Sequence, residues 1–245
     1  MAMAHAELWF VDLEKASGAL DALEAAKPRL SDVDNARFAA MTDGAARRNR
    51  RLAHIALRVL LERRCGPSIR GVPFAVGASG KPALACTNVT FSLAHTAASA
   101  LIAISDAGLV GVDLEHARKV KIPSARRAPI ERAAIALAAG VPLAEGDPDT
   151  RFLSAWVRIE AVAKATGSGV GPFLERLRPR RASKEEEGLA GAKGSSTVVA
   201  HDLTVAPGLL GAVALVPGQS LPPVRHLPEK AAALAALVSE GEGER

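Results

Sequence analysis

The sequence predicts an α+β fold of two similar halves (a pseudo-dimer), each a small antiparallel sheet covered by helices. Short apolar runs separated by tight turns are typical of antiparallel strands, and amphipathic patterns at helical spacing lie on either side of them. This order of elements occurs twice along the chain, with a boundary near residues 110–120. The expected domains are a first half over 1–112, a second half over 113–226, and a C-terminal helix and tail over 227–245.

The first half begins with a strand, because residues 7–13 (ELWFVDL) alternate and carry β-forming side chains. Helical patterns follow at 15–27, 32–41 and 45–64, and the last of these is amphipathic with many arginines. A Gly- and Pro-rich connection leads to three short apolar runs joined by tight turns. Strands are therefore expected at 89–94, 99–105 and 109–114.

The second half begins with helices and ends with a hairpin. Helical patterns cover 124–140 and 150–165, and the glycines at 167 and 169 are typical of a helix end. The polar, charged segment 178–196 predicts an exposed loop. Apolar runs at 197–205 and 209–216 predict a closing hairpin, and the Ala-rich residues 229–240 predict a final helix.

Composition favours a core-forming protein rather than a disordered one, with 49% hydrophobic and 23% charged residues among 245. The net charge of +5 and the pI near 9.6 fit an Arg-rich surface or a polyanionic ligand such as a nucleotide, a nucleic acid or an acidic protein. Cys65 and Cys86 fit no metal or CxxC spacing, which predicts free thiols in a reducing compartment. The N-terminal residues lack a signal-peptide pattern and no apolar run is long enough to span a bilayer, so we expect a cytoplasmic protein without a membrane partner.

Two carboxylates lie two positions apart in the run Gly111-Val-Asp113-Leu-Glu115. On a strand, residues i and i+2 point to the same face, so Asp113 and Glu115 project together while Val112 and Leu114 face the core. Neighbouring carboxylates repel each other unless a cation lies between them or one of them is protonated, and oxygen ligands favour Mg2+ or Ca2+. The alternative is an exposed strand face with two solvated acids.

A second group lies on the helix expected at 150–165. Trp156, Glu160 and Lys164 follow each other at intervals of four residues and so share one stripe of that helix. A Glu–Lys pair at this spacing is a common surface salt bridge. The helix is otherwise largely apolar, however, which predicts that both charges are partly sheltered and need a partner or a ligand.

Two further residues are weaker candidates when each is taken alone. His95 ends the strand Phe91-Ser-Leu-Ala-His95-Thr96, and a single histidine of this kind is more often structural than functional. Lys81 lies in Gly80-Lys81-Pro82, a turn from which its ammonium group can reach outward to a phosphate.

Together and in this order, these motifs resemble the 4'-phosphopantetheinyl transferases, in their Sfp-type branch of two similar halves in one chain. The resemblance is carried by GKP at 80–82, the His95-Thr96 strand end, GVDLE at 111–115, and the W-x-x-x-E-x-x-x-K-x-x-G helix from Trp156 to Gly167. The ELWFVDL opening and the Arg-rich helix are also similar, so the resemblance covers about residues 7–175.

The resemblance implies Mg2+-dependent transfer of 4'-phosphopantetheine from coenzyme A to a serine of an acidic apo acyl carrier protein, releasing adenosine 3',5'-bisphosphate. This is a holo-[acyl-carrier-protein] synthase activity of fatty acid or polyketide biosynthesis. The layout of two halves in one chain predicts a monomer. Asp113, Glu115 and Glu160 would be the metal ligands, and Glu160 would also be the general base. Lys164 would neutralise the diphosphate leaving group. The implied coenzyme A contacts are Lys81, His95, Thr96 and Lys164, with Arg47 and Arg50 at the 3'-phosphate.

Three positions depart from the family pattern. Ile159 replaces a lysine before Glu160, and Arg158 points about 100° away on a helix, which makes it a poor substitute. Ala94 replaces a serine before His95, and Ser92 stands where asparagine is frequent. These departures keep open a non-catalytic relative that binds coenzyme A or a carrier protein.

A basic nucleic-acid-binding protein is a further alternative, supported only by the pI and the arginine content. The chain contains few aromatic residues to stack on bases (3%), so we expect no nucleic-acid partner. Three basic clusters are candidates for steering an acidic carrier protein by electrostatic attraction: Arg118-Lys119, Arg126-Arg127 and Arg178–Arg181. The alternative for each cluster is scattered charge that keeps the surface soluble.

Overall fold

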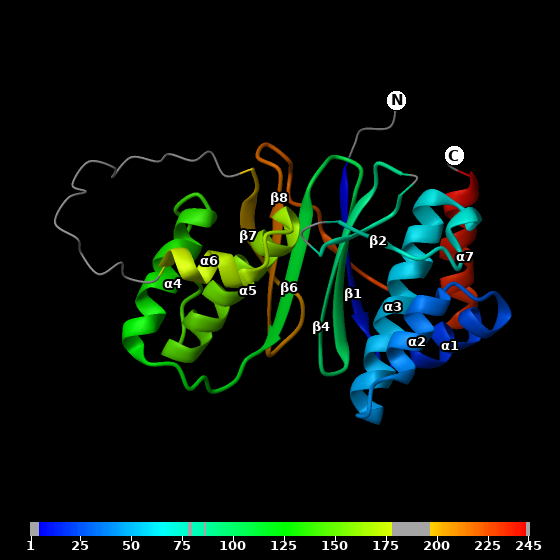
Figure 1. Cartoon of the computed structure of the whole chain (residues 1–245), viewed down its shortest axis with the longest axis horizontal. Coiled ribbons are helices and arrows are strands. Elements are labelled where there is room, and N and C mark those ends of the chain that lie inside the picture. Colours follow the sequence, from blue (N-terminus) through cyan, green and yellow to red (C-terminus); the bar gives the residue numbers. More distant parts are fainter. Residues whose placement is uncertain (1–4, 78–79, 86, 178–196, 244–245) are drawn as a thin grey trace.

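The computed structural model describes residues 5–77, 80–85, 87–177 and 197–243. Its elements form four layers, with helices outside and two sheets packed face to face between them (Figure 1). Within the described residues, no helix is long and apolar enough to cross a membrane. The predicted α+β class is confirmed, with small sheets that are each covered by helices on one side.

The first sheet has the strand order β4–β5–β1–β9. It contains β4 (Thr90–Thr96), β5 (Ser99–Ser105), β1 (Ala6–Asp12) and β9 (Val224–His226). Strands β4, β5 and β1 pair antiparallel, whereas β9 pairs parallel to β1. The strands expected at 89–94 and 99–105 pair with each other as predicted, but the third strand of that expected set, at 109–114, belongs to the second sheet. Strand β9 was not predicted because three residues are too few to show a pattern. It brings the chain back from the second half to the edge of the first sheet.

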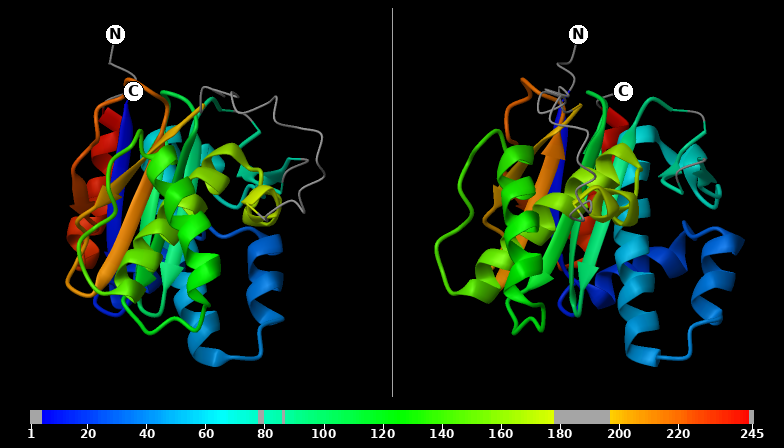
Figure 2. Two further views of the ribbon diagram at one scale, coloured as in Figure 1. Left: turned by 90° about the vertical axis from the view of Figure 1, so that its left-hand side faces the viewer. Right: turned by 60° about the vertical axis from the view of Figure 1, so that its left-hand side comes forward.

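The helices on the outer face of the first sheet are α1 (Ser17–Ala26), α2 (Asp32–Ala39), α3 (Gly44–Cys65) and α7 (Ala231–Gly243), and a 3-10 turn, η1, spans Pro67–Ile69. The Asp43 side chain caps the start of α3 by accepting hydrogen bonds from the amides of Ala45 and Ala46. Further along α3, the apolar stripe that the sequence predicts is buried in the core. Figures 1 and 2 show α2 beside the first half of α3, where the two helices are joined by a short connection.

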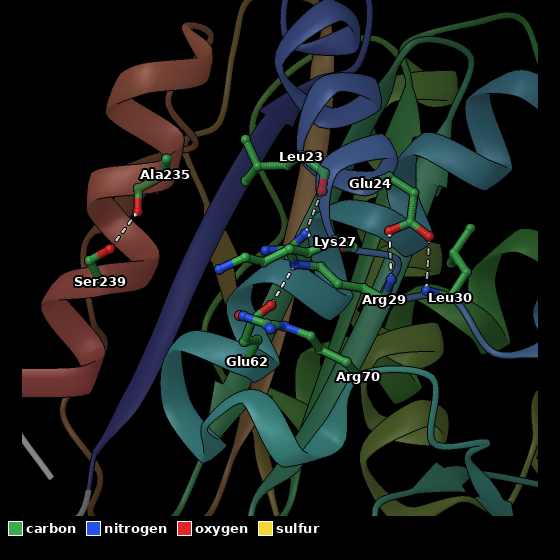
Figure 3. Close-up of polar contacts among 9 residues, drawn as sticks. All are labelled: Leu23, Glu24, Lys27, Arg29, Leu30, Glu62, Arg70, Ala235 and Ser239. Atoms are coloured by element: carbon green, nitrogen blue, oxygen red, sulfur yellow. Dashed lines mark hydrogen bonds and ion pairs between the residues drawn. The ribbon is translucent and has the colours of Figure 1, made fainter.

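A buried polar network fixes the connection between α1 and α2 against α3 (Figure 3). Arg29 Nε lies 2.5 Å from Glu62 Oε2, and its guanidinium also donates to the carbonyl of Leu23 at the end of α1. Glu62 pairs with Arg70 as well, and Glu24 accepts hydrogen bonds from the amides of Arg29 and Leu30. Because these charges are buried and paired, removing one partner would leave the other uncompensated.

The second sheet has the order β6–β8–β7 and is antiparallel throughout. Its strands are β6 (Val110–His116), β8 (Leu209–Leu215) and β7 (Val199–Leu203), and its helices are α4 (Ser124–Leu137), α5 (Pro148–Thr166) and α6 (Val170–Leu177). A separate two-stranded sheet joins β2 (Ala75–Val76) to β3 (Pro82–Ala83). Neither α6 nor this small sheet was predicted from the sequence. The loop expected at 178–196 and the thiol at Cys86 lie outside the described residues.

Strand β6 has two different faces. Val110, Val112 and Leu114 are buried in the cluster between the two sheets, which confirms that Val112 and Leu114 belong to the core. The opposite face turns toward α5, and Gly111 lies at the point of closest approach. A Cβ atom at position 111 would lie 2.1 Å from the carbonyl oxygen of Ala161 and 2.4 Å from the amide nitrogen of Ala165. Only glycine therefore allows this strand and this helix to cross so closely.

We expect Gly111→Ala to lower the free energy of unfolding by about 1–3 kcal/mol or more, because the added methyl group meets rigid backbone atoms. Urea denaturation measures the loss. Gly18→Ala in α1 is the matched control, since a Cβ there meets no atom within 4 Å and alanine is favoured in helices by about 0.5–1 kcal/mol. Equal stability of Gly111→Ala and the wild type would contradict the close crossing.

Candidate active site: a basic pocket between the two halves

A cavity of about 520 Å3 lies between the two halves of the chain, a size suited to a small-molecule or cofactor ligand. The first half contributes residues of α2, α3, β4 and the turn at 80–82, and the second half contributes α5 and the residues after it. The charged and imidazole side chains that line it are Asp34, Arg37, Arg50, His54, Lys81, His95, Glu160 and Lys164.

Positive charge prevails in this cavity. Burial lowers the pKa of His95, and the nearby cations of Arg50 and Lys164 lower it further. These two cations come from different halves of the chain and yet act on the same imidazole. A pocket in which cations repel one another is suited to a ligand with several negative charges.

The sequence predicted Arg50, Lys81, His95, Glu160 and Lys164 as site residues, and the structure brings all five to this cavity. Within the described part of the chain, four other candidates do not line it: Arg47, Thr96, Asp113 and Glu115. Asp113 is nevertheless linked to the cavity, because it binds a side chain that does line it.

Asp113 is buried, and its Oδ1 accepts a hydrogen bond of 2.7 Å from Lys164 Nζ. Burial raises the pKa of Asp113, while Lys164 acts in the opposite direction. The alternative that Asp113 is a solvated acid on an exposed strand face is therefore wrong. The face of β6 that bears it is covered by α5, which the strand pattern alone did not reveal.

Glu160 is half-buried, one helical turn before Lys164. Burial raises its pKa, and the negative charges of Asp113 and Glu115 raise it further, whereas Lys164 lowers it. Glu115 itself lies near the surface, 3.6 Å from Arg118. Both carboxylates of β6 thus raise the pKa of Glu160, as expected if the three acids are neighbours.

These three carboxylates fit a hard divalent cation in their chemistry, because their mutual repulsion is the condition that such an ion relieves. In the described residues, however, no group of three or more His, Cys, Asp or Glu side chains is placed to hold a metal ion. Lys164 serves as the counter-ion of Asp113. A cation that used all three acids would require Lys164 to turn away from Asp113.

The ammonium group of Lys81 was expected to reach outward to a phosphate, but it binds two backbone carbonyls instead. Its ammonium group donates to the carbonyl oxygens of Val110, at 3.0 Å, and Ala165, at 2.9 Å. The side chain forms part of the cavity wall, but its charged end is directed between β6 and α5.

One departure from the family pattern, Ile159, has a direct structural explanation. Ile159 is fully buried among apolar residues between α4 and α5, so a lysine there would place its charge in the core. Arg158 is also fully buried, and its guanidinium binds Asp202 and the carbonyls of Val141 and Pro142. This confirms that Arg158 does not substitute for a lysine at the pocket.

The other two departures lie on the inner face of β4. Ser92 is buried, and its hydroxyl accepts a hydrogen bond of 3.0 Å from the amide of Val112. Ala94 is buried in the cluster between the two sheets. Both residues therefore contribute to the contact between β4 and the second sheet.

His54 and Arg37 also line the cavity, and neither was predicted from the sequence. Burial lowers the pKa of His54 to about 4 despite the opposing effect of Asp34, and Arg50 and Arg37 lower it further. Its buried Nδ1 atom has no hydrogen-bond partner among the described residues. The available signal was the spacing of Arg50 and His54, four residues apart on an amphipathic helix.

Comparison with known proteins gives one informative match. The chain is 30% identical over 131 residues to a protein of Synechocystis sp. named "Putative 4'-phosphopantetheinyl transferase". The alignment covers 51% of this chain and 52% of that protein, so the chain spans about half the length of the relative that it matches. No family model matches the chain. The likeness supports a relationship to the phosphopantetheinyl transferase superfamily, and the Sfp-type branch stays a prediction.

The raised pKa of Glu160 predicts a specific effect on stability. As pH rises from the unfolded-state pKa of about 4.3 to the higher folded value, the unfolded chain ionises first, so ionisation of Glu160 destabilises the fold. We therefore expect Glu160→Gln to be more stable than the wild type at pH 7, and this advantage to disappear near pH 3. Urea denaturation at both pH values tests this.

The control is Glu240→Gln, at an exposed position of α7, which should change stability little at either pH. A surface salt bridge between Glu160 and Lys164 would give the opposite sign, because losing the pair would destabilise the protein at pH 7 by up to about 1 kcal/mol.

Proposed function

We propose that this protein transfers the 4'-phosphopantetheine group of coenzyme A to a serine of an apo acyl carrier protein. The observation that carries the proposal is the junction of a cation-rich cavity with Glu160, Lys164 and Asp113. Coenzyme A bears a diphosphate and a 3'-phosphate, which such a cavity would neutralise. The partial likeness to the Synechocystis protein supports the same reaction class.

The placement of the cations suggests how coenzyme A would lie. Lys164 binds Asp113 and lies close enough to His95 to lower its pKa, so these two side chains suit the diphosphate. Arg50 lies on α3, where the 3'-phosphate would be neutralised, and Arg37 on the facing helix α2 adds a second cation. Arg47 is exposed outside the cavity, so its contribution would need a movement of its long side chain.

Asp113, Glu115 and Glu160 would hold Mg2+, and the ion would supply charge neutralisation for the diphosphate. The side chains of the chain itself would do the remaining work. Lys164 would leave Asp113 and meet the charge that develops on the leaving phosphate. Because Lys164 lies next to Asp113, it could act either as the counter-ion of Asp113 or as the contact of the leaving phosphate.

In the proposed reaction, the carrier serine oxygen forms a bond to the phosphorus that bears the pantetheine arm. The bond from this phosphorus to the bridging oxygen breaks, and adenosine 3',5'-bisphosphate leaves with the electron pair. Glu160 would accept the serine proton, directly or through a water molecule. Its raised pKa suits a general base, because it makes the carboxylate a stronger proton acceptor.

The arginine clusters contribute unequally to the surface that would meet an acidic carrier. Arg127 is used internally, since its guanidinium binds Asp149 and the carbonyls of Val120 and Ile122. Arg118 and Lys119 are exposed next to Glu115, which leaves them available for a carrier that approaches the carboxylates. The cluster Arg178–Arg181 lies outside the described residues.

Incubation with apo carrier proteins, coenzyme A and Mg2+, followed by intact mass spectrometry, tests the function. We expect the wild type to add the mass of phosphopantetheine to the carrier. Glu160→Gln should slow transfer by roughly 100-fold or more, because the base is lost, while coenzyme A binding persists. Isothermal titration on the same variant measures that binding.

The two readouts separate the alternatives. Coenzyme A binding by the wild type without any transfer would favour the non-catalytic relative. Unchanged turnover of Glu160→Gln would refute the assignment of the base.

Coenzyme A should raise the melting temperature, and more so with Mg2+, because a ligand that binds only the folded state stabilises it. A short DNA duplex should have a small effect that disappears at moderate salt. Differential scanning fluorimetry compares the two ligands at equal phosphate concentration. A larger, salt-resistant shift with DNA would favour a nucleic-acid-binding protein.

A further inference from the structure

Lys81 connects the two halves of the chain at the edge of the cavity. It lies in the turn before β3, in the first half, yet its ammonium group binds the carbonyl oxygens of Val110 and Ala165. Val110 is the first residue of β6 and Ala165 belongs to the last turn of α5. One side chain therefore links the strand that bears Asp113 to the helix that bears Glu160.

The carbonyl of Ala165 is a favourable partner for a cation. The last four carbonyls of an α-helix have no intrahelical donor, and the helix dipole places negative charge at this end. Lys81 satisfies one of these carbonyls from outside the helix. The half-buried ammonium has lost part of its hydration, so both hydrogen bonds replace contacts with water.

The two bonds lie at the crossing of β6 and α5. Gly111, the residue after Val110, is where the strand approaches Ala161 and Ala165 most closely. Asp113 follows two residues later on the same face, and Glu160 lies next to Ala161 on the helix. A change in the spacing at this crossing would thus move the carboxylates relative to one another.

We propose that Lys81 is a positioning residue that holds β6 and α5 at the spacing that the carboxylate site requires. The part that concerns the carboxylate site rests on the proposed function. The link that Lys81 makes between its turn, β6 and α5, which we call the clamp, does not depend on the proposed function. A lysine that served only as a phosphate contact would instead direct its ammonium into the cavity.

Lys81→Met tests this, because methionine keeps most of the apolar stem and removes the charge. Without any ligand, we expect hydrogen exchange to become faster in β6 and in the last turn of α5, but not in α1 or α7. Mn2+, titrated as a probe and followed by electron paramagnetic resonance, should bind about 10-fold or more weakly, as is typical when the support of a metal ligand is lost. The coenzyme A dissociation constant in the absence of metal should stay within about twofold, well below the tenfold that corresponds to 1.4 kcal/mol.

Two matched variants complete the experiment. Lys230→Met makes the same change at an exposed lysine before α7 and should leave all three measurements unchanged. Arg50→Met removes a cation that lines the cavity, so it should weaken coenzyme A binding and leave hydrogen exchange in β6 unchanged. Lys81→Arg should restore much of the Mn2+ affinity, because a guanidinium can also donate to two carbonyls.

The outcomes separate the clamp from the function. Unchanged hydrogen exchange in Lys81→Met, with coenzyme A binding weakened as in Arg50→Met, would overturn the proposal and make Lys81 a phosphate contact. Faster exchange with unaltered Mn2+ affinity would overturn its role at the carboxylates. A wild type that binds neither Mn2+ nor coenzyme A would refute the proposed function, while the exchange data would still decide whether the clamp exists.

Discussion

The candidate site depends on the close crossing of β6 and α5. Gly111 makes the crossing possible, since a side chain there would overlap backbone atoms of Ala161 and Ala165. The crossing brings Asp113 and Lys164, 51 positions apart in the sequence, within 2.7 Å of each other. The packing of a strand against a helix, rather than a flexible loop, thereby sets the distances among the charged groups. Sites built on such elements hold their geometry more exactly than sites on loops.

The same packing shelters charges that are not fully balanced. Burial raises the pKa of Asp113 and Glu160, and it lowers the pKa of His95. Each of these shifts means that the charged form is less favourable in the folded protein than in water. A divalent cation would relieve the first group and a polyanion the second. The binding of both would therefore stabilise the folded protein.

The sequence predicted the fold class and most helices and strands, because amphipathic and alternating patterns depend on local side chains. It also predicted Glu160 and Lys164 on one helical stripe, and both line the cavity. It could not predict that α5 covers Asp113, that Lys81 binds backbone carbonyls, or that β9 pairs with β1, since these depend on contacts between distant segments. His54 was missed because its role depends on α2 packing beside α3.

The arrangement of the chain explains why the cavity needs both halves. The first half contributes Arg50 and His95 and the second contributes Glu160 and Lys164, so neither half contains a complete set of charges. The apolar cluster between the sheets holds them together, and the chain crosses back once more when β9 joins the first sheet and α7 packs against α3. Val224 of β9 packs against the cluster between the sheets. Among the described residues, none from β9 or α7 lines the cavity. The geometry of the site, in which Asp113 and Lys164 are held 2.7 Å apart, is therefore a property of the whole fold.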